Sequence, residues 1–366
     1  MMKIINLNLR ELKIPFKHSF SHAAATRNMT EAVIVQASSA SGHKGYGEGC
    51  PRSYVTGETI STVSSFFERH KASIYLIANL DDLTQWVDTH ELQIDKNPAA
   101  WCAIELALLD LLARQESVPI EKLLKQPILA NEFQYTAILG ANKHATFVKQ
   151  LEQYSQLGFS DFKLKITGDL EQDKLKIEAL RALTNVSTVR LDANNLWPMA
   201  DEAVAYIKAL DYDFLAIEEP LGVNDYEGCL SIHNALNIPI ILDESFLRQE
   251  QFKKILEHQG AWVLNIRVSK MGGLLRSLKI AEYAKENIIP IIIGAQVGET
   301  SILTRAALTI ANAYKPELIG QEGAFGAYLL EKDIVSEPLM FAKAGKLKVT
   351  NVSKSDGLGL VVNVSL

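Results

Sequence analysis

Apolar and polar residues follow two different periods along this chain of 366 residues. From about Phe133 onward, short apolar runs bounded by turn residues alternate with longer stretches in which apolar residues recur every three or four positions. The first pattern is typical of buried strands and the second of amphipathic helices. Strands that alternate with helices in this way indicate βα units and a parallel sheet.

Eight of these apolar runs have the length and composition of strands, and eight parallel strands can close into a barrel. Their predicted limits are 134–140, 161–166, 189–193, 214–219, 239–243, 262–267, 290–294 and 317–321. The chain is longer than such a barrel needs, so we expect a second folded part beside it.

The first hundred or so residues do not follow the βα period. Residues 32–38 and 44–49 predict a hairpin around Gly42, and residues 98–114 predict a largely buried helix with a proline in its first turn. From about residue 333 the chain returns to short β-like pieces. We therefore expect an α/β protein in three parts. They are an α+β capping domain (1–128), a TIM-like barrel (129–332), and a tail that returns to the capping domain (333–366).

Five residues with reactive side chains recur at successive gaps of 27, 26, 25 and 27 positions. They are Lys165, Asp192, Glu218, Asp243 and Lys270. A strand of about five residues, a helix of about eleven and two short connections add up to roughly this interval. Each residue is therefore expected at the same place in successive βα units, at the barrel mouth where such enzymes carry their active sites.

The three acids of this series end consecutive apolar strands. Any one of them alone could be explained as a helix N-cap or as a solvated carboxylate in a loop. Three carboxylates brought to one rim repel each other unless a cation neutralises them, which favours a bound divalent metal ion. Oxygen ligands suit octahedral Mg²⁺, with Mn²⁺ as a substitute. We expect Asp192, Glu218 and Asp243 to be the metal ligands.

The lysines suggest proton transfer beside that metal. Lys163 and Lys165 share one face of their strand because side chains alternate along it. Strands two and six are diametrically opposed in an eight-stranded barrel, so Lys165 and Lys270 are expected to face each other across the metal. A lysine is a poor base at neutral pH unless its pKa is lowered, and partial burial, the metal and Lys163 all act in that direction. A carboxylate substrate would present its α-carbon between the two lysines.

Composition excludes several other classes. The 37 basic and 43 acidic residues give a net charge of −6 without long runs of like charge, which argues against nucleic acid and anionic membranes as partners. The three cysteines form no Cys-x-x-Cys pair, and no signal-peptide pattern or run of about 18 apolar residues is present. We expect a cytoplasmic homo-oligomer whose ligand is a small carboxylate.

In these residues the chain resembles the enolase superfamily and, within it, the muconate-lactonizing-enzyme subgroup. Lys163-Leu164-Lys165 is similar to the subgroup's Lys-x-Lys, whose second lysine is the base, and the three acids and Lys270 match the metal ligands and the opposing lysine. A site with a lysine base and Mg²⁺ is the known pattern of this superfamily. The resemblance implies a (β/α)₇β barrel with an N-terminal capping domain that the C-terminal tail completes.

The resemblance also implies that two capping segments close over the barrel mouth and select the substrate. They are residues 16–27 and 52–59. Arg27 and Tyr54 are our candidates for substrate contacts, Arg27 because a guanidinium suits a substrate carboxylate. Other predicted substrate contacts lie at or after the strand ends. They are Asn194, Asn265, Gln296, Glu299 and Glu322.

Several overall reactions are compatible with these residues. The leading interpretation is a Mg²⁺-dependent isomerase of cycloisomerase or racemase type that removes a proton α to a carboxylate. Dipeptide or N-acyl amino acid epimerases, acid dehydratases and o-succinylbenzoate-synthase-type lyases share this first step. The region Gly320-Gln321-Glu322-Gly323 lacks the Asp-x-Asp with which dipeptide epimerases of the subgroup grip the substrate amine. More distant alternatives are a Schiff-base aldolase, which would be trapped by borohydride, and a catalytically silent binding protein.

Overall fold

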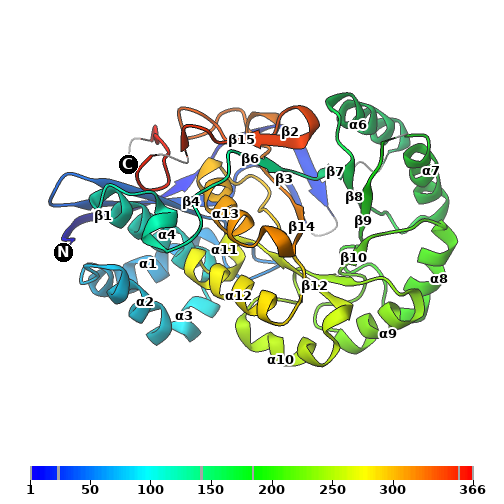
Figure 1. Ribbon diagram of the computed structural model, residues 1–366, viewed down its shortest axis with the longest axis horizontal. Helices are drawn as coiled ribbons and strands as arrows, with labels where there is room; N and C mark the ends of the chain where they lie inside the picture. The colour runs from blue at the N-terminus through cyan, green and yellow to red at the C-terminus, as the bar shows by residue number, and fades with distance from the viewer. Residues whose placement is uncertain (1, 23–24, 141–142, 184, 353–354, 365–366) are drawn as a thin grey trace.

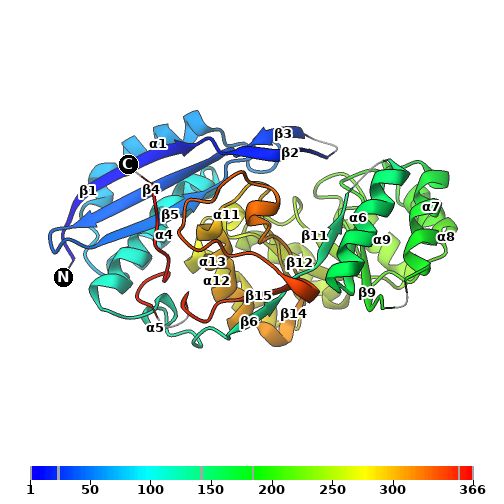
Figure 2. The ribbon, with the colours of Figure 1, turned by 90° about the horizontal axis from the view of Figure 1, so that it is seen from above.

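The computed structural model describes residues 2–22, 25–140, 143–183, 185–352 and 355–364. Its N-terminal part is a three-stranded antiparallel sheet with helices packed on it (Figure 2). The strands, in spatial order, are β1 (Ile4–Leu12), β4 (Ala32–Ser39) and β5 (Lys44–Gly49). The helices are α1 (Ile60–Ile74), α2 (Leu80–Thr89), α3 (Glu91–Asp95), α4 (Pro98–Gln115) and α5 (Ile120–Leu123). The predicted hairpin and the predicted buried helix are confirmed.

Glycines on β5 allow helix α4 to lie unusually close to the sheet. An ideal Cβ placed on any of three alternate glycines would come within 2.2 Å of a backbone oxygen of α4. The pairs are Gly45 with Ala107, Gly47 with Ala103, and Gly49 with Ala99. Of the glycines in this hairpin, Gly42 lies in the predicted turn, at φ +88°. The others are needed because the backbones approach each other closely.

The second part is a curled sheet of eight parallel strands with helices on its outer face (Figure 1). The strands are β7 (Ala137–Leu139), β8 (Asp161–Lys165), β9 (Thr188–Asp192), β10 (Ala216–Glu218), β11 (Ile240–Leu242), β12 (Trp262–Ile266), β13 (Ile291–Ile293) and β14 (Leu318–Gln321). They neighbour each other in chain order, and the Thr136 N–H donates to the Gln321 carbonyl to join the two edges. All eight predicted strands are confirmed.

The connecting helices follow the strands as a (β/α)₇β barrel requires. They are α6 (His144–Leu157), α7 (Leu170–Arg181), α8 (Ala200–Leu210), α9 (Tyr226–Leu236), α10 (Phe252–Ile255), α11 (Val268–Met271), α12 (Leu274–Glu286) and α13 (Ser301–Ala313). Of these connecting helices, α10 and α11 have four residues each. Among the described residues, no helix is both long and apolar enough to cross a membrane.

The C-terminal tail runs back to the capping domain, as expected. Its strand β15 (Lys346–Lys348) pairs with β6 (Glu132–Gln134), and residues 357–360 then bond to α4 and α5. The Leu358 N–H donates to Asp110 Oδ1 at 2.7 Å, and the Ile120 N–H donates to the Gly357 carbonyl at 3.0 Å. We retain the domain limits 1–128, 129–332 and 333–366 as our proposal.

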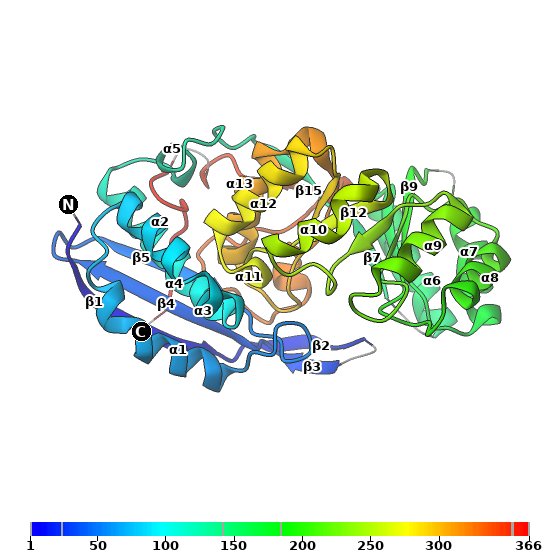
Figure 3. The same cartoon turned by 90° about the horizontal axis from the view of Figure 1, so that it is seen from below.

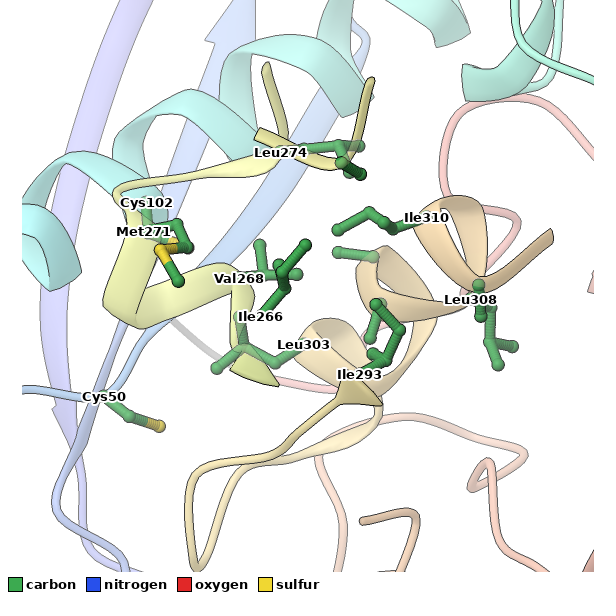
Figure 4. Packing of buried hydrophobic residues seen from close by; sticks show 14 of the residues in the cluster. Cys50, Cys102, Ile266, Val268, Met271, Leu274, Ile293, Leu303, Leu308 and Ile310 are labelled. Carbon is green, nitrogen blue, oxygen red and sulfur yellow. The ribbon is translucent and has the colours of Figure 1, made fainter. Parts of the chain in front are cut away.

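The capping domain and the barrel share a tightly packed interface. Helix α11 lies between α4 of the capping domain and α13 of the barrel (Figure 3), and apolar side chains such as Met271 and Leu274 fill this region beside Cys102 (Figure 4). Buried carboxyl groups of the capping domain also meet the starts of barrel helices. Glu48 accepts hydrogen bonds from Thr300 and Leu303 at α13, and Glu105 accepts one from Leu275 N at α12 (2.9 Å).

Glu105 should make stability depend on pH near neutrality. Burial raises its pKa from 4.5 to about 7, against the opposing effect of the hydrogen bonds from Leu275 and Trp101. Because the folded state holds the proton more tightly, the stabilisation is complete below pH 4.5 and is lost as pH rises through 7. In Glu105→Gln, we expect the fall in unfolding free energy between pH 5 and 8 to shrink by about 3 kcal/mol at most. Urea titrations at both pH values would measure it. The same change at the exposed Glu116, which follows the last residue of this helix, should leave the fall intact, and an equal fall in both variants would contradict the assignment.

Candidate active site

Strand β8 directs two lysines toward the barrel interior. Lys163 and Lys165 alternate with the buried Phe162 and Leu164, and the parallel register sets Lys165 beside Asp192 on β9. The Lys163 side chain is 3% exposed and the Lys165 side chain 18% exposed. Lys163 is therefore enclosed within the barrel, whereas Lys165 reaches toward its open end.

The lysines of β8 pair with the first two acids of the predicted series. Lys165 Nζ lies 2.8 Å from Asp192 Oδ2 and also donates to Asn194 Oδ1 at 2.9 Å. Lys163 Nζ lies 2.6 Å from Glu218 Oε2 and 3.2 Å from Asp192 Oδ2. The predicted proximity of lysines and carboxylates is thus present on three neighbouring strands.

The third acid pairs with the lysine from the opposite side of the barrel. Lys270 Nζ, on α11 just after β12, lies 2.8 Å from Asp243 Oδ1 and donates to the backbone oxygens of Asp243 and Asn265. Strands β8 and β12 are four apart in the sheet, so the two lysines approach the row of carboxylates from its two ends. The side chains therefore form one continuous row of contacts between the two outer lysines. Lys163 joins Asp192 to Glu218, and Arg267 joins Glu218 to Asp243.

Arg267 is a site residue that the sequence analysis overlooked. Its guanidinium forms an ion pair with Asp243, and its Nη2 lies 3.9 Å from Glu218 Oε1. It follows β12 by one residue and lies two positions after Asn265, which donates to Glu218 Oε1 at 3.3 Å. The alternation of Asn265 and Arg267 at a strand end was a usable signal for their common direction.

Burial and charge act differently on the individual groups. Burial lowers the pKa of Lys270 below its usual value. The Asp243 carboxylate opposes this shift only in part, and the positive charge of Arg267 adds to it. For Lys163, burial is outweighed by Asp192, Glu218 and Glu322, which raise its pKa well above the usual value. Lys270 thus has the lowered pKa that the proposed chemistry requires, while Lys163 is held as a cation.

The carboxylate row has a donor set suited to a hard divalent cation. Asp192, Glu218 and Asp243 are each 2% exposed or less and lie at or just after the ends of adjacent strands. Glu218 Oε2 is buried and accepts no well-aligned hydrogen bond, although Lys163 Nζ is 2.6 Å away. Within the described part of the chain, no three acid, histidine or cysteine side chains converge as they stand. The carboxylates point to Lys163, Arg267 and Lys270, and would have to turn from these cations to share a metal.

The structure distributes the predicted substrate contacts over five places. Asn194 bonds to Lys165 and Asn265 to Glu218, whereas Glu322 lies against Lys163 inside the barrel. Gln296 and Glu299 pair with each other in the loop after β13, where the Gln296 N–H donates to Glu299 at 2.8 Å. Arg27 and Tyr54 also lie together, with Arg27 Nη1 3.4 Å from the Tyr54 hydroxyl.

The predicted capping loop 16–27 is largely a β-hairpin. Strands β2 (Pro15–His22) and β3 (Ala25–Met29) form it, and residues 23 and 24 lie outside the described part of the chain. Arg52, the first residue of the predicted segment 52–59, binds backbone oxygens of two other segments. Its guanidinium donates to the carbonyls of Glu31 at 2.7 Å and Val297 at 2.6 Å, so it joins the capping domain to the loop after β13.

Two family models match the chain over nearly its whole length. The model for "Mandelate racemase / muconate lactonizing enzyme, N-terminal domain" matches residues 4–125, and "Enolase C-terminal domain-like" matches residues 146–365.

Individual relatives carry the same architecture. A hydrophobic dipeptide epimerase of Enterococcus faecalis is 30% identical over 318 residues, covering 86% of this chain and 88% of the relative. An N-succinyl-L-Arg/Lys racemase of Bacillus cereus is 24% identical over 335 residues, covering 91% and 90%. The crystal structure of a dipeptide epimerase from Enterococcus faecalis, with Mg and the dipeptide L-Leu-L-Tyr, superposes with a TM-score of 0.85. It is 27% identical and covers 98% of this chain and all of its own.

Proposed function

Because this chain belongs to the mandelate racemase / muconate lactonizing enzyme family of the enolase superfamily, we propose that it is a Mg²⁺-dependent racemase or epimerase. It would act on the carbon α to a substrate carboxylate. The observation that carries the proposal is the placement of Lys165 and Lys270 at opposite ends of a row of three buried carboxylates.

The proposed chemistry divides the work among these residues. Asp192, Glu218 and Asp243 would hold the metal, which supplies a Lewis acid for the substrate carboxylate. One lysine removes the α-proton and the other returns a proton to the opposite face, because they stand on opposite sides of the site. Lys163 and Arg267 add fixed positive charge beside the enolate that forms between these two steps.

The residues at the end of β14 favour a substrate whose nitrogen carries no charge. Gln321 is buried and donates to the Tyr135 hydroxyl at 2.9 Å, and both oxygens of Glu322 are occupied by Lys163 and Arg190. Neither side chain offers a free carboxylate to a substrate ammonium group. We therefore propose an N-acyl amino acid as the substrate class. A dipeptide with a free amine is the second candidate, supported by the Enterococcus faecalis relative.

Exchange of the substrate α-proton for deuterium in D₂O tests this function. We expect N-acyl amino acids to exchange and to racemise in the presence of Mg²⁺, dipeptides to do so more slowly, and EDTA to stop both. NMR of the products separates racemisation from lactonisation and dehydration. Exchange that persists in EDTA would overturn the metal assignment, and faster exchange of dipeptides would select the second candidate. Absence of exchange with every carboxylate offered would refute the function.

We also keep three finer proposals for this enzyme. They are a small carboxylate as its ligand class, a homo-oligomeric state and a cytoplasmic location. The net charge of −6 disfavours polyanionic partners, and in this respect it supports a small molecule as the ligand. Sedimentation of the purified protein and fractionation of the cells that make it would test the other two.

A further inference from the structure

Glu322 is held inside the barrel by two cations. It follows β14, is 6% exposed, and its two carboxylate oxygens take separate partners. Oε2 lies 3.2 Å from Lys163 Nζ, and Oε1 lies 3.2 Å from Arg190 Nη1. Both partners are buried, and each lies two residues before Lys165 or Asp192 on its strand, so both contacts lie within the barrel.

Arg190 is itself fixed by the layer of side chains beneath the carboxylate row. It is fully buried on β9, two residues before Asp192, and its Nη2 donates to the Thr136 hydroxyl at 2.5 Å. Asp161 Oδ2 lies 3.7 Å from the same nitrogen. A Cβ added to Gly320 would come within 2.6 Å of the Arg190 Cζ, so the glycine leaves room for the guanidinium.

Lys163 has three carboxylate partners, and two of them are proposed metal ligands. Its Nζ lies within 3.2 Å of Asp192, Glu218 and Glu322. When Asp192 and Glu218 turn toward a metal, Glu322 is the carboxylate that still faces Lys163. Without it, a buried ammonium would stand beside a divalent cation with no anionic partner of its own, which is costly in a poorly polarisable interior.

We propose that Glu322 is a positioning residue that holds Lys163 when Asp192 and Glu218 bind the metal, and that Arg190 in turn holds Glu322. This rests on the metal site of the proposed function, but not on the identity of the substrate. It also replaces the substrate contact that the sequence predicted for Glu322.

Titration calorimetry of Mg²⁺ into the substrate-free enzyme tests the proposal. In Glu322→Gln, we expect the Mg²⁺ dissociation constant to rise by about 10-fold or more, as for other residues that support metal ligands. With a substrate found by deuterium exchange, kcat should fall by about 10-fold while KM changes less than about threefold. A substrate contact gives the opposite pattern, in which KM rises while kcat and Mg²⁺ affinity stay unchanged, and that result would overturn the proposal.

Two further variants separate positioning from general damage. Glu322→Asp keeps the charge and should recover part of the Mg²⁺ affinity, whereas Gly320→Ala displaces Arg190 without removing a polar group and should weaken Mg²⁺ binding in the same direction. Glu337→Gln, the same chemical change at an exposed position, should behave as the parent enzyme. If folded Glu322→Gln and Gly320→Ala both bind Mg²⁺ as the parent does, the proposal is wrong. Because calorimetry needs no substrate, this outcome is distinct from a failure of the proposed reaction.

Discussion

Replacement of either Lys165 or Lys270 by alanine is expected to abolish racemisation while leaving half of the exchange chemistry in place. Racemisation needs a proton removed on one face and delivered on the other, so loss of either lysine should lower its rate by about 10³-fold or more. The remaining lysine can still remove and return a proton on its own face. Each variant should therefore exchange the α-proton of one enantiomer only, and the two variants should select opposite enantiomers.

NMR in D₂O with separate enantiomers measures both rates in one experiment. Lys174→Ala provides the control, because this lysine is on the barrel's outer helix α7 and its side chain is 40% exposed. Exchange of both enantiomers in either active-site variant would show that the missing lysine is not a base. Selection of the same enantiomer by both variants would show that the lysines do not act on opposite faces.

The repeated spacing of the reactive residues made the barrel predictable. A period of about 26 residues is set by local strand and helix lengths, so it can be read without knowing any long-range contact. The same period places Asp192, Glu218 and Asp243 on adjacent strands, and the register indeed pairs Glu218 with Asp192. The order of these residues around the barrel mouth could therefore be predicted from the sequence, and they make up most of the candidate site.

The direction of individual side chains was less accessible, because it depends on partners from distant strands. Glu322 was placed at the mouth by its position after β14, but Arg190 and Lys163 draw it inward from β9 and β8. The alternation of Arg190 with Asp192 marked both as inward-facing, yet only the fold shows that Gly320 makes room for the guanidinium. The role of the glycines of β5 was equally inaccessible, since the helix that they accommodate comes about fifty residues later.

Loss of the central carboxylate should remove the metal from the enzyme. Glu218 lies between the other two acids along the sheet, and it contacts Lys163 and Asn265 as well as facing Arg267. In Glu218→Gln, we expect Mg²⁺ affinity to fall by at least about 100-fold, because a ligand should matter no less than the residues that orient it. The α-proton exchange rate should fall by about 10³-fold or more, which corresponds to the several kcal/mol that a Lewis acid contributes.

Glutamine keeps the size of the side chain and its bond to Asn265, so the barrel should remain folded and the loss can be assigned to the carboxylate. Calorimetry with Mg²⁺ and, separately, Mn²⁺ measures the binding, and circular dichroism checks the fold. Glu227→Gln, an exposed change at the start of the neighbouring helix α9, should leave both binding and exchange unaltered. If folded Glu218→Gln still binds Mg²⁺ as tightly as the parent, the three carboxylates are not the metal site. Their pairing with Lys163, Arg267 and Lys270 would then be a purely structural network of buried ion pairs.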